Sequence, residues 1–179
     1  MTFGGVKDTR AMLIWKSPVP LKVKIFFWMA MHDRIQCGVQ LKKKKWSGPE
    51  KCFVCDQFET SDHILFQCPL AIFLWTFLQE CLGWDVAPTS CLSLFLEIVE
   101  KSRGKKQTLI LFLSAGALWS LYKSRNDLVF NKKVMASPAV LIHKTLMLLK
   151  SWRPLLKTKM KPMADDVMNL ISANSASAL

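Results

Sequence analysis

The spacing of cysteine and histidine is the feature that most restricts what this chain can fold into. Three cysteines and one histidine follow one another as Cys52-x2-Cys55-x7-His63-x4-Cys68. A Cys-x2-Cys pair bends through a tight turn so that both thiolates face one point, and a later His and Cys close the site from a second segment. Zinc takes four such ligands in a tetrahedron, at about 2.3 Å for sulfur and about 2.0–2.1 Å for nitrogen. Because these side chains leave no position for water, the spacing predicts a structural zinc site and not a hydrolytic one.

A chance cluster of buried cysteines is the competing interpretation, because free cysteine is a common core residue. The segment Lys51–Ser61 argues against it, since it is too polar for a core segment and has no other evident means of becoming ordered. Structural zinc supplies roughly 10–16 kcal/mol of apparent free energy in small finger peptides, which is ample to order such a loop. The sequence therefore favours zinc as a cofactor.

The remaining cysteines and histidines lack partners at ligand spacing. Cys37, Cys81 and Cys91 lie in or beside apolar helical segments, and we interpret them as core residues. His32 is predicted on a helix surface and His143 on a solvated face. The N-terminal residues show no secretory signal, so the cysteines are expected to be reduced.

Most of the chain is predicted to be helical, with short polar breaks between the helices. Pro69 suits a first helical position and Gly83 a helix end, which defines one helix sharply. Residues 103–106 are interpreted as a basic break, and at most a small hairpin is expected near the cysteines. The predicted helical segments are Leu21–Ile35, Gly38–Lys45, Pro69–Leu82, Cys91–Lys101, Gln107–Phe130 and a last one that Ser137-Pro138 opens and that reaches about Trp152. The predicted fold class is mainly α, a helical bundle with a small zinc-stabilised loop between helices.

Four regions are expected along the chain. They are an N-terminal arm (1–20), a zinc-binding domain (21–82), a C-terminal helical region (83–156) and a disordered tail (157–179). The tail is assigned as disordered because it is polar and rich in small residues.

The charge of the chain favours polyanionic partners. Lys and Arg number 25 against 13 Asp and Glu, a net charge of +12. Such a field attracts nucleic acid first and anionic membrane second, although a soluble protein with a basic surface is the alternative. An apolar fraction of 51% excludes a disordered chain. The uncharged stretches His63–Gln79 and Gln107–Tyr122 fall short of the roughly 20 residues that a bilayer requires, so buried helices explain them better than membrane spans.

A family resemblance rests on residues around the cysteines. The run Pro18-Val19-Pro20-Leu21-Lys22, then Trp46, Cys52-Phe53-Val54-Cys55, His63-Ile64-Leu65-Phe66 and Cys68-Pro69 resembles the plant reverse-transcriptase-like zinc-binding domain of non-LTR retrotransposon polyproteins. The resemblance covers roughly residues 12–82, and Leu118-Trp119 with Arg125-Asn126 resembles the helical segment that often follows. It implies zinc ligands at Cys52, Cys55, His63 and Cys68 and a role in nucleic-acid binding.

No enzyme is expected in this chain. Asp165-Asp166 follows Met163-Ala164 and does not form the Tyr-x-Asp-Asp motif of a polymerase palm. Two-metal polymerase chemistry needs carboxylates gathered from several strands, and the sequence shows no such gathering. We find no endonuclease or ribonuclease H constellation either.

Candidate nucleic-acid contacts are mostly lysines, which supply charge without base recognition. Trp46 and Phe53 are candidates for stacking on bases, but packing of the zinc loop onto a neighbouring helix is the favoured alternative for both. Further lysine clusters are Lys132-Lys133 and Lys157, Lys159 and Lys161. The candidate contact residues are Lys42, Lys43, Lys44, Lys45, Trp46, Lys51, Phe53, Arg103, Lys105 and Lys106.

Two functions from different classes follow. The first is a zinc-binding, non-catalytic, retroelement-derived module that binds RNA or DNA nonspecifically. The second is a recruited protein–protein interaction module that uses the apolar helices after Pro69. Association with a membrane through Gln107–Tyr122 is a weaker third possibility. The favoured compartments are the nucleus and the cytoplasm, and the sequence leaves the oligomeric state and the protein partner open.

Overall fold

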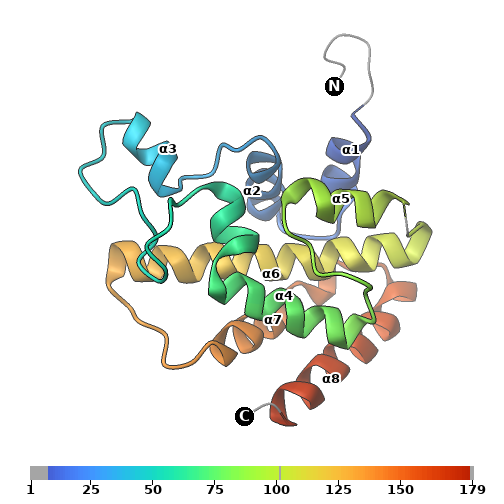
Figure 1. The fold of residues 1–179 in the computed structure, drawn as a ribbon. Coiled ribbons are helices and arrows are strands. Elements are labelled where there is room, and N and C mark those ends of the chain that lie inside the picture. Colours follow the sequence, from blue (N-terminus) through green and yellow to red (C-terminus); the bar gives the residue numbers. More distant parts are fainter. Residues whose placement is uncertain (1–7, 101, 178–179) are drawn as a thin grey trace.

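The computed structural model describes residues 8–100 and 102–177. Within these residues the chain consists of packed helices and contains no β-strand, so the predicted mainly α fold class is confirmed (Figure 1). The α-helices are α1 (Thr9–Lys16), α2 (Leu21–Met31), α3 (Gly38–Lys43), α4 (Pro69–Leu82), α5 (Cys91–Glu100), α6 (Gly104–Asn131), α7 (Ala139–Trp152) and α8 (Lys161–Ser177). Three short turns complete the list: η1 (His63–Gln67), η2 (Arg153–Leu155) and η3 (Thr158–Met160).

Helix α6 is the axis of the fold. Helices α2, α4, α5 and α7 and the turn η1 all pack against it, and α8 packs against α4 and α7. Residues 109–118 are buried without interruption, which is the pattern of a helix that is covered on every side. This burial is the reason for the uncharged stretch in the sequence. Among the described residues, no helix has both the length and the apolar character needed to cross a membrane.

The contact between α6 and α7 is close because Gly116 faces α7. A Cβ atom at Gly116 would lie 2.8 Å from Leu149 Cδ2, so only glycine fits without movement of that side chain. One turn further along α6, the Ser120 and Thr145 hydroxyls hydrogen-bond at 2.7 Å across the same interface. Leu149 itself is fully buried. The small residues Gly116 and Ser120 of α6 therefore allow α7 to approach closely.

Local sequence signals placed several helix ends correctly. Helix α4 runs from Pro69 to Leu82, and Gly83 follows it in the left-handed conformation at φ 62°, as predicted. The Ser90 hydroxyl accepts a hydrogen bond from the Ser93 amide at the start of α5, and the Ser137 hydroxyl accepts one from Ala139 at the start of α7. These caps agree with the cap residues that the sequence offers.

Three predicted ends require correction. Helix α2 stops at Met31 and not at Ile35, because Asp33 adopts a left-handed φ of 51° and turns the chain. Helix α3 stops at Lys43, and Lys45 has a left-handed φ of 62°. Helix α6 begins at Gly104, so residues 104–106 belong to the helix and do not break it. The predicted Lys101 end of α5 lies outside the described residues.

The expectation of a disordered tail was wrong. Residues 161–177 form helix α8, and its apolar side chains at Ala164, Met168 and Ile171 are buried. Their spacing of four and three residues forms one helical stripe, which packs onto α4 and α7. The predicted arm 1–20 likewise contains helix α1, whose Ile14 is buried. The boundary between a zinc-binding domain ending at 82 and a following helical region remains a prediction.

The segment between α3 and η1 contains the cysteine loop, by which we mean residues 50–59. The Glu59 amide donates to the Glu50 carbonyl at 3.0 Å, which closes the base of the loop. Lys51 and Phe58 form an isolated antiparallel bridge just inside that base. The expected small hairpin near the cysteines is therefore present in a minimal form. Figure 1 shows this loop against the end of α6 that leads into α7.

Candidate metal centre

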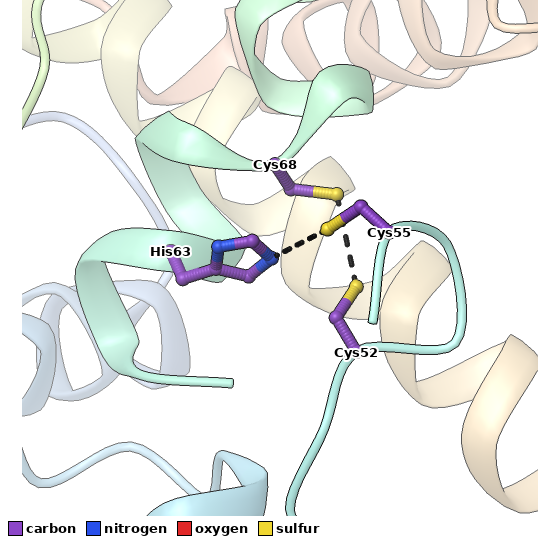
Figure 2. Close-up of side chains that lie close together, drawn as sticks. All are labelled: Cys52, Cys55, His63 and Cys68. Atoms are coloured by element: carbon purple, nitrogen blue, oxygen red, sulfur yellow. Dashed lines mark hydrogen bonds between the residues drawn. The ribbon is translucent and has the colours of Figure 1, made fainter. Parts of the chain in front are cut away.

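The four predicted ligands converge on one point. The sulfur atoms of Cys52, Cys55 and Cys68 and a ring nitrogen of His63 all lie within 4.8 Å of one another. Figure 2 shows the cysteine loop presenting Cys52 and Cys55 to a second segment that carries His63 and Cys68. Cys52, His63 and Cys68 are buried, and Cys55 is half-buried. The sequence motif thus becomes one compact group of donor atoms.

The spacing of the donor atoms fits a tetrahedral ion. Bonds of about 2.3 Å to sulfur and about 2.0–2.1 Å to nitrogen place two sulfurs about 3.8 Å apart, and a sulfur and a nitrogen about 3.5 Å apart. The Sγ atoms of Cys52 and Cys68 are 3.9 Å apart. The Cys55 Sγ and His63 Nε2 atoms are 3.3 Å apart. The four side chains therefore surround a volume of the size that such an ion occupies.

The first pair of ligands is positioned by a tight turn. The Val54 amide donates to the Cys52 sulfur at 3.4 Å, and the Asp56 amide donates to the Cys52 carbonyl at 3.0 Å. Asp56 has a left-handed φ of 58°, which reverses the chain directly after Cys55. Amides that point at a thiolate stabilise its charge and orient it. The turn thus both aims Cys52 and favours its ligand form.

The second pair is positioned by the single π-helical turn η1. The Cys68 amide donates to the His63 carbonyl at 2.7 Å, an i to i+5 bond that brings the two ends of the turn together. His63 is itself held by a hydrogen bond from its amide to the Thr60 hydroxyl at 3.1 Å. Cys68 is also the N-cap residue of α4. Because α4 packs in the core, this half of the site rests on a rigid element.

The thiols of the site are electrostatically linked. The hydrogen bond between the Cys52 and Cys68 sulfurs lowers the pKa of Cys52 to about 4 and raises the pKa of Cys68. Burial raises the pKa of the Cys55 thiol. A bound divalent cation would favour the thiolate form of the three cysteines, because thiolates are the ligand form.

A buried ion pair ties the cysteine loop to α6. Arg125 of α6 donates from Nε to the Glu59 carboxylate at 3.0 Å, and its Nη2 makes a second, shorter hydrogen bond to the same oxygen. That oxygen also accepts from the Gly38 amide at 2.8 Å, at the start of α3. Arg125 further donates to the Gln36 carbonyl at 3.1 Å. Both side chains of the pair are buried, so Glu59 is the point where the loop, α3 and α6 are joined.

The sequence did not single out this pair for a positioning role. Glu59 and Arg125 are separated by 66 positions, and no local pattern links residues at such a distance. The resemblance includes Arg125-Asn126, but Arg125 is surrounded by polar residues in the sequence, so nothing there indicates that it is buried and needs a partner. The structure supplies that partner.

The predicted nucleic-acid contacts near the cysteine loop lie on one end of the molecule. Lys42, Lys43, Lys44 and Lys45 are exposed at the end of α3. Trp46 stands against Gly48 and has its ring centre 6.0 Å from that of Phe130 at the end of α6. Phe53 is 48% exposed, and the Lys132 ammonium lies 4.8 Å from its ring centre. Lys51 is exposed and pairs with Asp56 at 2.9 Å.

The other predicted contacts are distant. Arg103, Lys105 and Lys106 are exposed at the start of α6, whereas the cysteine loop packs near its end. A helix of 28 residues is about 40 Å long, so the structure does not bring this cluster to the loop. Lys132 and Lys133, which follow α6, lie at the loop end instead. The lysines that are close to the ligands in the sequence therefore lie at the loop, and Lys132 and Lys133 join them from the far end of α6.

The remaining cysteines and histidines lie outside the cluster. Cys37, Cys81 and Cys91 are buried and reduced, as the interpretation of core residues requires. His32 and His143 are exposed, and the His32 ring shares a hydrogen bond with the Trp28 carbonyl at 2.8 Å. Among the described residues, the Cys52 cluster is the only group of His, Cys, Asp and Glu that can hold a metal ion.

Comparison with protein families supports the interpretation of this site. Residues 1–75 match the family described as zinc-binding in reverse transcriptase. The matched residues contain all four ligands and end within α4. No curated protein and no solved structure matches the chain. The fold and the family match thus agree on a metal-binding module in the N-terminal part of the chain.

Proposed function

We propose that this protein is a zinc-binding, non-catalytic module of retroelement origin that holds nucleic acid without sequence preference. The observation that carries the proposal is the convergence of three sulfurs and one imidazole nitrogen within 4.8 Å. The match of residues 1–75 to a zinc-binding family of reverse transcriptases supports the metal and the origin together. A fragment of a plant non-LTR retrotransposon polyprotein is the source that best suits the sequence resemblance.

Zinc is the metal that the donor set favours. Thiolate and imidazole ligands suit zinc, whereas carboxylate and carbonyl oxygens suit magnesium and calcium. Zinc bound by four protein ligands supplies cross-linking energy and no open coordination position. In this arrangement Cys52 and Cys55 would hold the cysteine loop, and His63 and Cys68 would attach it to the start of α4.

A surface of lysines supports the nucleic-acid role. We call this surface the basic end, and it is formed by Lys42, Lys43, Lys44, Lys45, Lys51, Lys132 and Lys133. Trp46 joins its two parts, since Trp46 contacts Phe130 shortly before Lys132 in the sequence. Lysines contact phosphates as point charges and read no base edges, so the expected binding is salt-dependent and nonspecific. The half-exposed ring of Phe53 offers a stacking surface for an unpaired base.

Metal analysis tests the zinc site. The purified full chain is expected to carry about one zinc per molecule, because one set of four ligands converges. The variant Cys52→Ser is expected to lose that zinc, whereas Cys81→Ser, a buried cysteine outside the cluster, is expected to keep it. Full zinc content in Cys52→Ser would overturn the ligand assignment.

Salt-dependent binding tests the nucleic-acid role. The affinity for single-stranded RNA should fall steeply and linearly with salt on logarithmic axes. Replacing Lys132 and Lys133 by glutamine should reduce that slope by roughly one for each lysine. The same change at Lys157 and Lys159, exposed residues outside the basic end, is the matched control and should leave the slope unchanged. Binding that does not respond to salt, or equal effects of both pairs, would contradict the proposal.

A further inference from the structure

A cavity opens directly beside the metal cluster. It has a volume of about 230 Å³, and two ligands of the cluster, Cys52 and Cys68, form part of its wall. We call it the loop pocket. Its walls come from the cysteine loop, η1, the start of α4, the end of α6, the linker from α6 to α7 and the first turn of α7. Its apolar lining includes Val54, Ile64, Leu128, Val134, Met135 and Leu141.

Apolar side chains that are not buried in the core are exposed at the mouth of the loop pocket. Val134 is 81% exposed, and Phe53 and Val54 are 48% and 42% exposed. All three border the pocket, and they come from two segments that are far apart in the sequence. Contiguous exposed apolar surface around a concave site is typical of a binding site. Met135 adds a flexible side chain of the kind that adapts to different ligands.

The rim of the loop pocket is positively charged. Lys133 lines the pocket, and Lys132 lies over the Phe53 ring. The one carboxylate in the lining is Glu59, which Arg125 neutralises through the buried ion pair. Negative groups that flank an apolar anchor would therefore meet lysines, while the anchor itself would meet aliphatic side chains. This combination sets the chemistry of a suitable ligand.

From these contacts we infer that the loop pocket is the docking site for an acidic segment of a partner protein that carries one or two large apolar side chains. A leucine or phenylalanine side chain needs no polar partner inside an aliphatic pocket. Apart from Lys133 at the rim, the polar side chains of the lining are already hydrogen-bonded: Arg125 to Glu59, the Ser124 hydroxyl to Lys144 and the Ser137 hydroxyl to the Ala139 amide. A nucleobase would therefore leave hydrogen-bonding groups of its edge without partners there, which is costly. This inference is separate from nucleic-acid binding, although both ligands would share Lys132 and Lys133 and would therefore compete.

Peptide binding to the zinc-loaded full chain tests this inference. The probe is a short fluorescein-labelled peptide of Asp and Glu with Leu and Phe four residues apart, and its control carries Ser at those two positions. Fluorescence anisotropy should show saturable binding of the first peptide only. Val134→Gln should weaken it by about tenfold, the value of one buried valine side chain. Val86→Gln, an equally polar change at a 68% exposed valine far from the pocket in sequence, should leave it unchanged.

The alternative outcomes are distinct. Equal binding of the two peptides would mean attraction by charge alone and would overturn the inference. Equal weakening by Val134→Gln and Val86→Gln would do the same, because the pocket would then have no special role. Loss of oligouridylate binding on Val134→Gln, with no binding of the apolar peptide, would assign the pocket to nucleic acid instead. Unchanged zinc content in each variant shows that the comparison is made between folded proteins.

Discussion

The cysteine loop and the α6–α7 pair are held in place by opposite means. In the loop, the large apolar side chains Phe53, Val54 and Phe58 are exposed, and order depends on the metal ligands and one buried ion pair. In α6, residues 109–118 are all buried, and order depends on packing. One chain thus combines a region with few packed apolar side chains, for which we propose a bound metal, with a region that is held by packing. This difference predicts that removing the metal should disorder only the loop, whereas disrupting the packing should lower the stability of the α6–α7 pair.

Removal of the metal should give the largest effect and the most local one. Because structural zinc contributes roughly 10–16 kcal/mol in small finger peptides, a strong chelator should disorder the cysteine loop. The α6–α7 pair should keep its helical structure, since no ligand lies in either helix. Hydrogen exchange measured by peptide is the direct test: amides of residues 50–59 should lose protection while those of residues 109–118 keep it. Cooperative loss of both would show that the comparison is false.

The ion pair between the two regions should give the next largest effect. Arg125→Met leaves the Glu59 carboxylate buried without its partner, which should lower the free energy of unfolding by about 3–5 kcal/mol. Urea unfolding measures this loss. Adding Glu59→Gln removes the unpaired charge but keeps an acceptor for the Gly38 amide, so the double variant should recover part of the stability.

Lys144→Met is the control for that experiment. Lys144 of α7 pairs at 3.5 Å with Asp127, which lies on α6 as Arg125 does. Both of these side chains are about one-third exposed. Such pairs contribute about 0–1 kcal/mol. A cost for Arg125→Met as small as that for Lys144→Met would mean that α6 does not hold the loop.

Truncation in the packed region should have a comparable or slightly smaller cost without touching the metal. Leu149 is fully buried against Gly116, and Leu149→Ala should lower the free energy of unfolding by about 2–5 kcal/mol through the cavity that it leaves. Zinc content should stay at its original value. Loss of zinc in this variant would show that the two regions unfold as one.

The last expected effect is absent at neutral pH and appears only at alkaline pH. Burial, assisted by the charge of Asp62, raises the pKa of the Cys91 thiol to about 12 from an ordinary value of 9. A raised pKa stabilises the fold fully below pH 9, and this contribution is lost as the pH rises toward 12. Cys91→Ala should therefore make the loss of stability between pH 9 and 12 less steep than in the original chain. An unchanged slope would contradict this assignment.

Local signals account for what the sequence predicted well. Pro69 and Gly83 fix the two ends of α4 by backbone conformation alone, and ligand spacing fixes the four residues of the metal centre. Interactions between distant residues account for the rest. No residue close to Glu59 in the sequence indicates that Arg125 is its partner. The apolar stripe of α8 is buried only because α4 and α7 pack against it. The basic end and the loop pocket were likewise hidden, because they form where residues near 53 and 133 meet.

The ion pair has a consequence for how this protein should be divided. The segment that matches the zinc-binding family ends at residue 75 and keeps every ligand, but it excludes Arg125. A fragment cut at that point would present the Glu59 carboxylate without its guanidinium, so its metal affinity would not report that of the intact protein. A fragment that keeps this ion pair must therefore include Arg125 of α6, and boundaries taken from sequence matching alone would separate the two partners.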